Sequence, residues 1–197
     1  MNDILSDSAL DQIFRTARSY NGWKPSEIDD VTLEALHNLA AFGPTSANSC
    51  PARFVFLKTS AGKERLKPYL IPDNVDKVMA ASVVAIIGHD MAFYEKIPQL
   101  FPHNPGARDW FAGNEPLIEQ TAFRNGTLQG AYLMIAARAL GLDCGPMSGF
   151  DNGGVDAEFF AGTEVKSNFI CSLGVGDPAT IFPRSPRLSF DEACQVL

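Results

Sequence analysis

The sequence predicts a fold of mixed helices and strands, organised as a single domain over residues 1–197. Segments with apolar residues at helical spacing alternate along the chain with short apolar runs typical of strands. No proline- or serine-rich linker, internal repeat or low-complexity tract interrupts them. Of the 197 residues, 46% are hydrophobic and 20% are charged, which is enough apolar material for a sizeable core.

In the first half of the chain, the pattern predicts the elements one by one. Asp30 and Ser60 are suited to cap helices, because their side-chain oxygens can accept a hydrogen bond from the first turn. Residues 83–88, VVAIIG, have the continuous apolar run of a strand that is covered on both faces. The expected elements are, in order, a helix at 8–20, a helix at 30–40, a strand at 53–58, helices at 60–70 and 74–81, and a strand at 83–88.

The second half contains the longest expected helix. Residues 93–113 are rich in aromatic residues, proline and glycine without a clean period, and we expect an irregular segment. Pro116 suits the first turn of a helix that extends to about Leu140 and is apolar on every side at 130–137. Such a helix belongs in the middle of a subunit or at a subunit interface. We expect a helix near 155–160, a strand at 168–174 and a short helix started by a capping box at 189–192.

Residues 141–151, GLDCGPMSGFD, are the most informative segment of the chain. Three glycines and a proline interrupt the preceding helix, so we expect a turn whose backbone N–H groups are not used by a helix or a sheet. Because a rigid helix would hold this turn in place, the segment is a candidate floor for a flat ligand.

The charge and the scattered cysteines exclude several functions. Sixteen basic and 23 acidic residues give a net charge of −7, which argues against a nucleic-acid partner. No apolar run suggests a membrane span, and the amino terminus lacks the pattern of a signal peptide, so we expect a cytoplasmic protein. The four cysteines are far apart and no histidine stands at ligand spacing, so we expect no metal site.

The absence of several motifs favours an organic cofactor for any redox function. The chain has no P-loop, complete G-x-G-x-x-G, G-x-S-x-G or H-E-x-x-H. Flavin mononucleotide (FMN) suits the residues present, and arginine is the natural partner for its phosphate because the planar fork can make two bonds to phosphate oxygens. The candidates are Arg18, Arg184 and Arg187, although any one of them taken singly is more often a solvated surface charge.

Four motifs together resemble the FMN-dependent nitroreductase family over nearly the whole chain. They are PTSANSCPAR at 44–53, Asn74 with Lys77, the 141–151 segment, and PRLSF at 186–190. Within the family, residues 21–23, 43–48 and 122–125 resemble the malonic semialdehyde reductase (3-hydroxypropionate dehydrogenase) branch of pyrimidine degradation. The resemblance implies an α+β fold with a mixed, mostly antiparallel sheet flanked by helices. It also implies an intertwined homodimer with two FMN sites at the interface, and a role for the apolar helix in the dimer core.

The resemblance also implies which residues hold FMN. Arg18 and Ser19 resemble contacts to the phosphate and the ribityl chain. Arg187 resembles a late phosphate-binding arginine, and Arg184 is a further candidate. Two residues separate this pair, which departs from the spacing of one residue in many relatives.

Around the flavin ring, the resemblance implies contacts from two subunits. Asn74 and Lys77 resemble contacts to the ring edge and the ribityl chain. Backbone N–H groups of Ser148 and Gly149 would face flavin N5 and O4, although many relatives have Glu at Ser148. The residues that resemble ring contacts are Pro146, Met147, Ser148 and Gly149 from one subunit, and Pro44, Thr45, Ser46 and Asn48 from the other.

The implied mechanism is a ping-pong cycle, in which NADH or NADPH gives a hydride to flavin N5 and a small-molecule acceptor then takes the electrons. No side chain is expected to be a nucleophile. For malonic semialdehyde, the acceptor carries a carboxylate, and Arg53 and Arg124 are the candidate partners. The alternative is a non-catalytic flavin-binding or electron-carrier protein, which would hold FMN in the same way without oxidising a nicotinamide.

Overall fold

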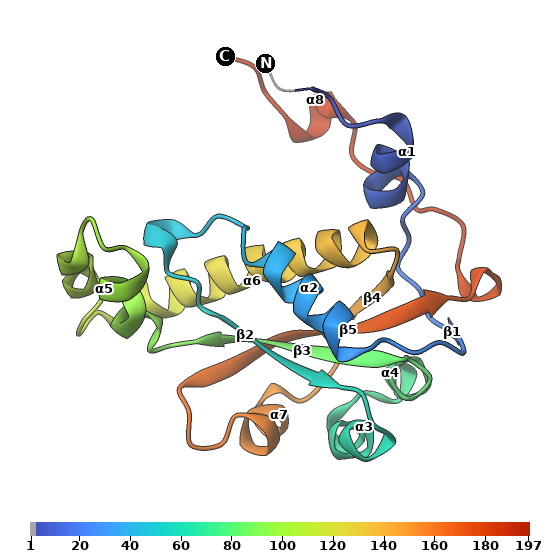
Figure 1. Ribbon diagram of the computed structural model, residues 1–197, viewed down its shortest axis with the longest axis horizontal. Helices are drawn as coiled ribbons and strands as arrows, with labels where there is room; N and C mark the ends of the chain where they lie inside the picture. Colours follow the sequence, from blue (N-terminus) through green and yellow to red (C-terminus); the bar gives the residue numbers. More distant parts are fainter. Residues whose placement is uncertain (1–2) are drawn as a thin grey trace.

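The computed structural model describes residues 3–197 and is built on a five-stranded sheet (Figure 1). The strand order is β1-β5-β3-β2, and β4 also pairs with β5. Each of these strand pairs is antiparallel, which confirms the expected mostly antiparallel sheet. The strands are β1 (Trp23–Lys24), β2 (Ala52–Leu57), β3 (Val83–Asp90), β4 (Asp143–Met147) and β5 (Val165–Gly176).

Helices cover both faces of the sheet (Figure 1). On one face lie α2 (Asp30–Ala40) and α6 (Glu115–Ala139), and on the other lie α3 (Ser60–Leu66), α4 (Pro72–Met79) and α7 (Asn152–Phe159).

The strand β3 packs against the helices on both faces of the sheet. Val83, Ala85 and Ile87 pack in the cluster formed with α2 and α6, whereas Val84 and Ile86 pack in the cluster formed with α3, α4 and α7. This alternation is the period of two of a strand, and all five side chains are buried. The expectation of a strand covered on both faces is therefore confirmed.

The helix α6 is a core helix that also carries exposed apolar residues. A Cβ atom at Gly126 would lie 2.8 Å from the Cβ of His89, and one at Gly130 would lie 2.6 Å from the Phe169 ring, so the two glycines let α6 approach the sheet closely. The same helix leaves Phe123 52% and Leu128 45% exposed. No helix in residues 3–197, α6 included, has the length and apolarity needed to cross a membrane.

Residues 93–113 consist of short helical turns rather than irregular chain. They form η4 (Phe93–Lys96), α5 (Ile97–Leu100) and η5 (Pro105–Trp110), each four to six residues long. Phe93, Ile97 and Phe111 are buried in a small cluster of their own with the start of α6. The sequence shows no clean period here because each turn is too short to repeat one.

Two expected helix caps are wrong by one residue. Asp29, not Asp30, caps α2, because its carboxylate accepts a hydrogen bond of 2.7 Å from the N–H of Thr32. Thr59, not Ser60, caps α3 in the same way. In both places two adjacent residues can cap a helix, and the preceding one has the extended backbone that the position requires.

The expected turn at 141–151 is the largest difference between the sequence pattern and the structure. Gly141 ends α6 with a φ of 80°, and residues 143–147 then form the strand β4 along β5. Pro146 is compatible with this strand because the strand path pairs β4 with β5 alone, and proline is tolerated at a sheet edge. The open backbone expected of the whole segment is therefore confined to Ser148 and Gly149, just beyond the strand.

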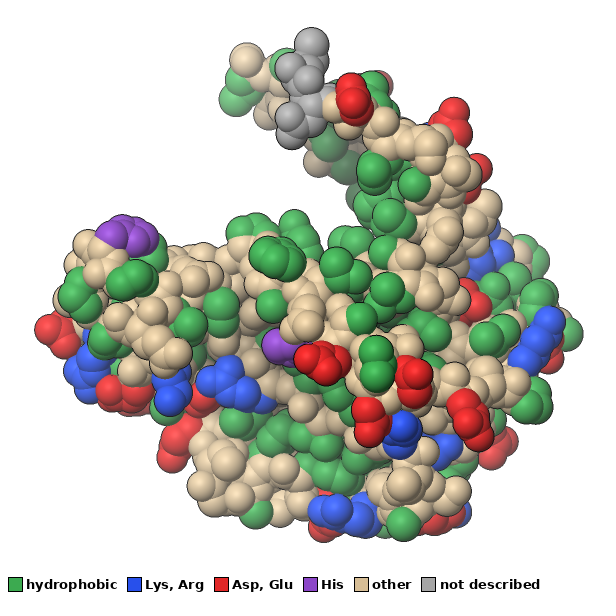
Figure 2. All heavy atoms as spheres, in the orientation of Figure 1, with side chains coloured by type: hydrophobic (Ala, Val, Ile, Leu, Met, Phe, Trp, Pro, Cys, Tyr) green, Lys and Arg blue, Asp and Glu red, His purple; other side chains and the backbone are tan. Residues whose placement is uncertain are grey.

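The segments that carry the first and the last helix project from the body of the molecule (Figure 1). The helix expected at 8–20 is shorter, because α1 (Asp7–Leu10) continues as the π-helical η1 (Asp11–Arg15) and ends there. The capping box at Ser189 is confirmed and starts α8 (Phe190–Ala193). Figure 2 shows hydrophobic side chains along this projecting arm and on the body beside it. The large exposed apolar residues of the two ends include Ile4, Leu5, Phe14, Phe182, Leu188, Phe190, Val196 and Leu197.

Candidate functional site

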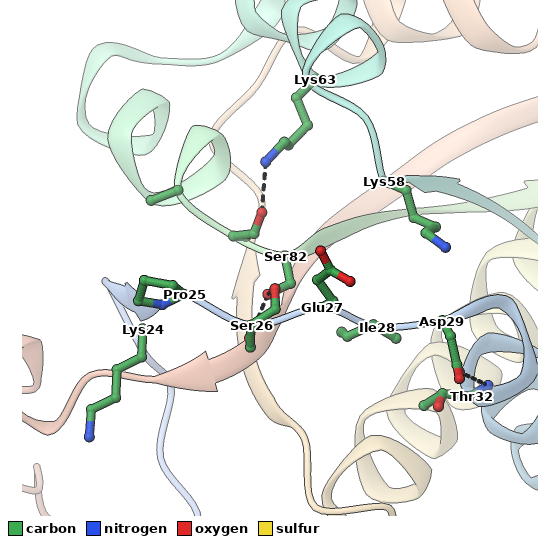
Figure 3. Close-up of a pocket in the computed structure, with 12 residues that line it drawn as sticks. Lys24, Pro25, Ser26, Glu27, Ile28, Asp29, Thr32, Lys58, Lys63 and Ser82 are labelled. Carbon is green, nitrogen blue, oxygen red and sulfur yellow. Dashed lines mark hydrogen bonds between the residues drawn. The ribbon is translucent and has the colours of Figure 1, made fainter.

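A cavity of about 710 Å³ is lined by residues 24–29, by Lys63 of α3 and by residues 80–82, which follow α4 (Figure 3). Its buried Lys63 donates to the carbonyls of Met79 at 2.9 Å and Ala81 at 2.7 Å, and burial lowers the pKa of this lysine. Ser26 and Ser82 bond each other, with 2.7 Å between the two hydroxyl oxygens. These polar groups already have structural partners, and the cavity contains none of the expected cofactor residues.

A second cavity, of about 510 Å³, brings together the residues expected at the FMN phosphate. Arg18, Ser19, Arg184 and Arg187 all line it, although more than 160 residues separate the two pairs in the chain. Arg138, at the end of α6, lines the same cavity and was not expected. The only sequence signal for Arg138 is a basic residue in the last turn of a long helix.

Hydrogen bonds from the arginines hold the two chain ends around this basic cavity. Arg184 Nη2 donates to the carbonyls of Arg15 at 2.8 Å and Ala17 at 2.9 Å. Arg18 Nη2 donates in the opposite direction, to the carbonyl of Phe182. Each segment therefore fixes the other, and four cationic side chains converge on one hollow with an arrangement suited to a phosphate.

The strand β4 connects the basic cavity to the segment expected beneath the flavin. Ser19 forms an isolated bridge with Cys144 near the start of β4, and the Tyr20 N–H donates to the Cys144 carbonyl at 3.0 Å. Burial and the nearby carboxylate of Asp143 raise the pKa of Tyr20, so its phenol stays neutral at neutral pH. From Cys144 the strand runs to Met147, and Ser148 and Gly149 follow directly.

The other end of β4 has the groups expected near the flavin ring. Asn74 is buried and its Nδ2 donates to the Gly149 carbonyl at 3.0 Å, while Lys77 Nζ lies 3.4 Å from Asn74 Oδ1. A Cβ atom at Gly149 would lie 2.4 Å from Ile71 Cδ1, so only glycine fits there without displacement. Within residues 3–197, the backbone N–H groups of Ser148 and Gly149 donate no hydrogen bond. These two donors are therefore available to a ligand.

An apolar hollow of about 290 Å³ lies against the same segment. Pro146, Met147 and Ser148 form one wall, and α6 and Phe169 form the other. The α6 residues that line it are Thr127, Ala131 and Met134. The hollow is shallow and open, which leaves room for further groups from outside this chain.

The loop at Pro44–Asn48 is attached to a different part of the molecule. The Ser46 N–H donates to Asn125 Oδ1 on α6 at 2.9 Å, and Asn48 Nδ2 donates to the Leu100 carbonyl at 2.8 Å. Three residues here that are not glycine have left-handed backbone: Ala47, Asn48 and Cys50, with φ between 41° and 50°. No hydrogen bond among residues 3–197 joins this loop to Pro146–Gly149. Within residues 3–197 of one chain, no hydrogen bond therefore links the two expected ring segments.

The two arginines expected to bind the substrate differ in how many protein groups they already contact. Arg53 Nη2 forms an ion pair of 2.5 Å with Asp90, and its Nη1 donates to the carbonyls of Cys50 and Ala52. Arg124 lies exposed on α6, and no ion pair is formed by it within residues 3–197. A role in substrate binding stays a prediction for both, with Arg124 the more available of the two.

Comparison with known proteins identifies the group to which this architecture belongs. Residues 14–177 match the model of the nitroreductase family. A relative from Cupriavidus pinatubonensis is 60% identical over 193 residues, which cover 97% of this chain and 98% of the relative. HadB of Ralstonia pickettii is 57% identical over 190 residues, which cover 95% and 97%. Both relatives carry the provisional name NADH dehydrogenase/NAD(P)H nitroreductase.

Solved structures agree on the fold. A nitroreductase-like protein of Exiguobacterium sibiricum, determined in complex with FMN, superposes with a TM-score of 0.87 over all of both chains at 19% identity. A similar protein from Bacillus subtilis has a TM-score of 0.85 and 20% identity, over 96% of this chain and 99% of its own. FMN is the cofactor used in this family. The family match over most of the chain and the relatives at about 60% identity lead to one conclusion: the chain belongs to the nitroreductase family.

Proposed function

We propose that the protein is a cytoplasmic, FMN-dependent NAD(P)H oxidoreductase that reduces a small acceptor, with malonic semialdehyde as the candidate substrate. The observation that carries the proposal is that the two ends of β4 lie beside different kinds of groups. At its start lies the basic cavity with Arg18, Ser19, Arg184 and Arg187, and at its end lie the free N–H groups of Ser148 and Gly149. An elongated molecule with an anionic phosphate at one end and a flat ring at the other matches this arrangement.

FMN, when bound, would supply the redox chemistry, which is transfer of a hydride (two electrons with one proton) from NAD(P)H to the acceptor; with one more proton from water, an aldehyde acceptor would become an alcohol. The chain supplies binding and orientation. The arginines neutralise the phosphate, the hollow beside Met147 accepts a flat ring, and the amides of Ser148 and Gly149 stabilise negative charge at its edge.

We also propose that the active form is an intertwined homodimer. The projecting arm exposes apolar residues such as Phe182 and Leu188, and α6 exposes Phe123 and Leu128. Apolar surface of this extent is typical of a protein–protein interface. The Pro44–Asn48 loop bonds to Asn125 and Leu100 and, within residues 3–197, forms no hydrogen bond to the ring segment of its own chain, which agrees with a site completed by a second copy.

The experiment that tests the function is anaerobic mixing of the FMN-loaded protein with NADH or NADPH while the flavin absorbance is recorded. Rapid bleaching, followed by recovery of the oxidised spectrum when an acceptor is added, is the expected result. A flavin that stays oxidised would identify a non-catalytic carrier instead. A protein that takes up no FMN would contradict both functions.

The choice of acceptor is tested separately, by comparing kcat/KM for malonic semialdehyde, quinones and a neutral nitroaromatic compound. If Arg124 binds the substrate carboxylate, Arg124→Ala should raise KM for the aldehyde acid about tenfold, the effect of one charge-assisted bond, and leave the nitroaromatic unchanged. Equal losses with both substrates would contradict the role of Arg124.

A further inference from the structure

Arg138 lines two cavities. It lines the basic cavity with Arg18, Arg184 and Arg187, and it also lines an adjoining cavity of about 510 Å³ that Tyr20 and Asp143 border. The residue lies in the last turn of α6, the helix that packs across the sheet. It is therefore attached to the body of the molecule, whereas Arg184 and Arg187 belong to the carboxy-terminal arm.

The guanidinium of Arg138 has few partners for its five donors. Its Nη1 donates to the Ile13 carbonyl at 3.3 Å. Its Nε is buried and has no hydrogen-bond partner within residues 3–197. No carboxylate in that range forms an ion pair with it. A buried donor without a partner is unfavourable, and such groups in native proteins often mark a position that another molecule completes.

The other arginines of the cavity already hold protein groups. Arg184 Nη2 bonds two carbonyls, Arg18 Nη2 bonds one, and Arg187 Nη1 bonds the carbonyls of Ser185 and Pro186 in its own segment. Arg138, like Arg18, makes a single hydrogen bond, and among the arginines of this cavity within residues 3–197 it is the one with a buried Nε that has no partner.

We propose that Arg138 is a fourth arginine of the phosphate site and binds the terminal phosphate of FMN, turning its guanidinium from the Ile13 carbonyl toward the cavity. This inference rests on the proposed function. It gives the site one anchor on the rigid helix α6, so that the phosphate is fixed relative to the sheet and to the amides beyond β4. A purely structural alternative is that Arg138 serves only to hold the end of η1.

The test compares FMN with riboflavin, which has the same ring and ribityl chain but no phosphate. Dissociation constants of both are measured on the apoprotein by flavin fluorescence, for the wild type, Arg138→Gln, Arg138→Lys and the control Arg65→Gln, which changes an exposed arginine of α3. Loss of one charge-assisted contact should weaken FMN binding by Arg138→Gln about 10- to 100-fold, with riboflavin changed less than about twofold. Arg138→Lys should show a smaller loss with the same selectivity, since lysine keeps the charge without the fork.

Two results would overturn the role of Arg138 and leave the proposed function standing: full FMN affinity in both variants, or equal losses of FMN and riboflavin, which a structural role predicts. Should Arg138→Gln fail to fold, Arg138→Lys carries the comparison, and its riboflavin affinity reports an intact site. Wild-type protein that binds neither flavin would overturn both this inference and the proposed function.

Discussion

The two ends of β4 are built in different ways. The end proposed for the phosphate is made of arginine side chains that come from both terminal segments and from α6, and its hollow is polar. The end proposed for the flavin ring is made of backbone, with two N–H groups that have no partner within residues 3–197 and a glycine packed against Ile71 and Asn74. Charge should therefore control binding at the first end, whereas shape and backbone position should control it at the second.

The largest effect is expected from removing charge at the phosphate end. The double variant Arg18→Ala, Arg184→Ala loses two charge-assisted partners, so FMN affinity should fall by about 100-fold or more. Riboflavin affinity should change much less. The control is Arg65→Ala, which removes an exposed arginine paired with Glu158 on the other face of the sheet. Parallel losses of FMN and riboflavin in the double variant would show that it had disturbed the fold, and the proposed difference between the ends would fail.

At the proposed ring end, the backbone N–H of Ser148 should matter for kcat, and its side chain should not. Ser148→Ala keeps the N–H and should change kcat less than about twofold, whereas Ser148→Pro removes the donor and should lower kcat by roughly 100-fold, the usual effect of losing one donor to a developing negative charge. Stopped-flow measurement of flavin reduction checks this. A large effect of Ser148→Ala would contradict it.

A smaller effect is expected from crowding the same end. Gly149→Ala places a methyl group 2.4 Å from Ile71 Cδ1, so the segment must shift, at a cost of about 1–3 kcal/mol. FMN and riboflavin should lose affinity to the same extent, because the phosphate is not involved. Gly153→Ala is the matched control, since its nearest neighbour would be 3.5 Å away. A phosphate-selective loss in Gly149→Ala would reverse the assignment of the two ends.

The smallest effect concerns stability and should leave both ends unchanged. His89 is buried on β3, and burial together with the charge of Lys166 lowers its pKa below 6.5, although Asp156 and Glu119 act in the opposite direction. Below pH 6.5 the unfolded chain then binds a proton that the folded chain does not, so the free energy of unfolding should fall as the pH decreases. Urea denaturation at pH 7.5 and 5.5 should show a smaller decrease for His89→Gln than for the wild type. An equal decrease in both would assign the acid sensitivity to other groups.

Local chemistry explains which parts could be predicted. The apolar run at 83–88 and the capping box at Ser189 depend on neighbours in sequence, and both are confirmed. The strand β4 was not expected, because its pairing with β5 is a long-range contact that overrides the turn tendency of Gly145 and Pro146. The caps at Asp29 and Thr59 depend on backbone angles that the sequence does not specify.

In the candidate site, too, residues could be predicted where local sequence identifies them and could not be predicted where long-range packing places them. Arg18, Arg184 and Arg187 could be named from residue type and family resemblance, and the structure places them in one cavity. Arg138 could not, because nothing near the end of α6 in sequence reveals that the chain ends pack there. The availability of the Ser148 and Gly149 amides likewise depends on where the ladder of β4 stops.

The left-handed backbone at Ala47, Asn48 and Cys50 has a kinetic consequence. Left-handed backbone costs each of these three residues roughly 1–2 kcal/mol, so the loop would not adopt this shape by itself. Buried amides of α6 hold it on both sides, Asn125 at the Ser46 N–H and Gln129 at the Ala52 N–H. The loop is therefore already ordered before a ligand arrives. A molecule that binds against it should associate at a rate limited by encounter, with no slow step of loop closure.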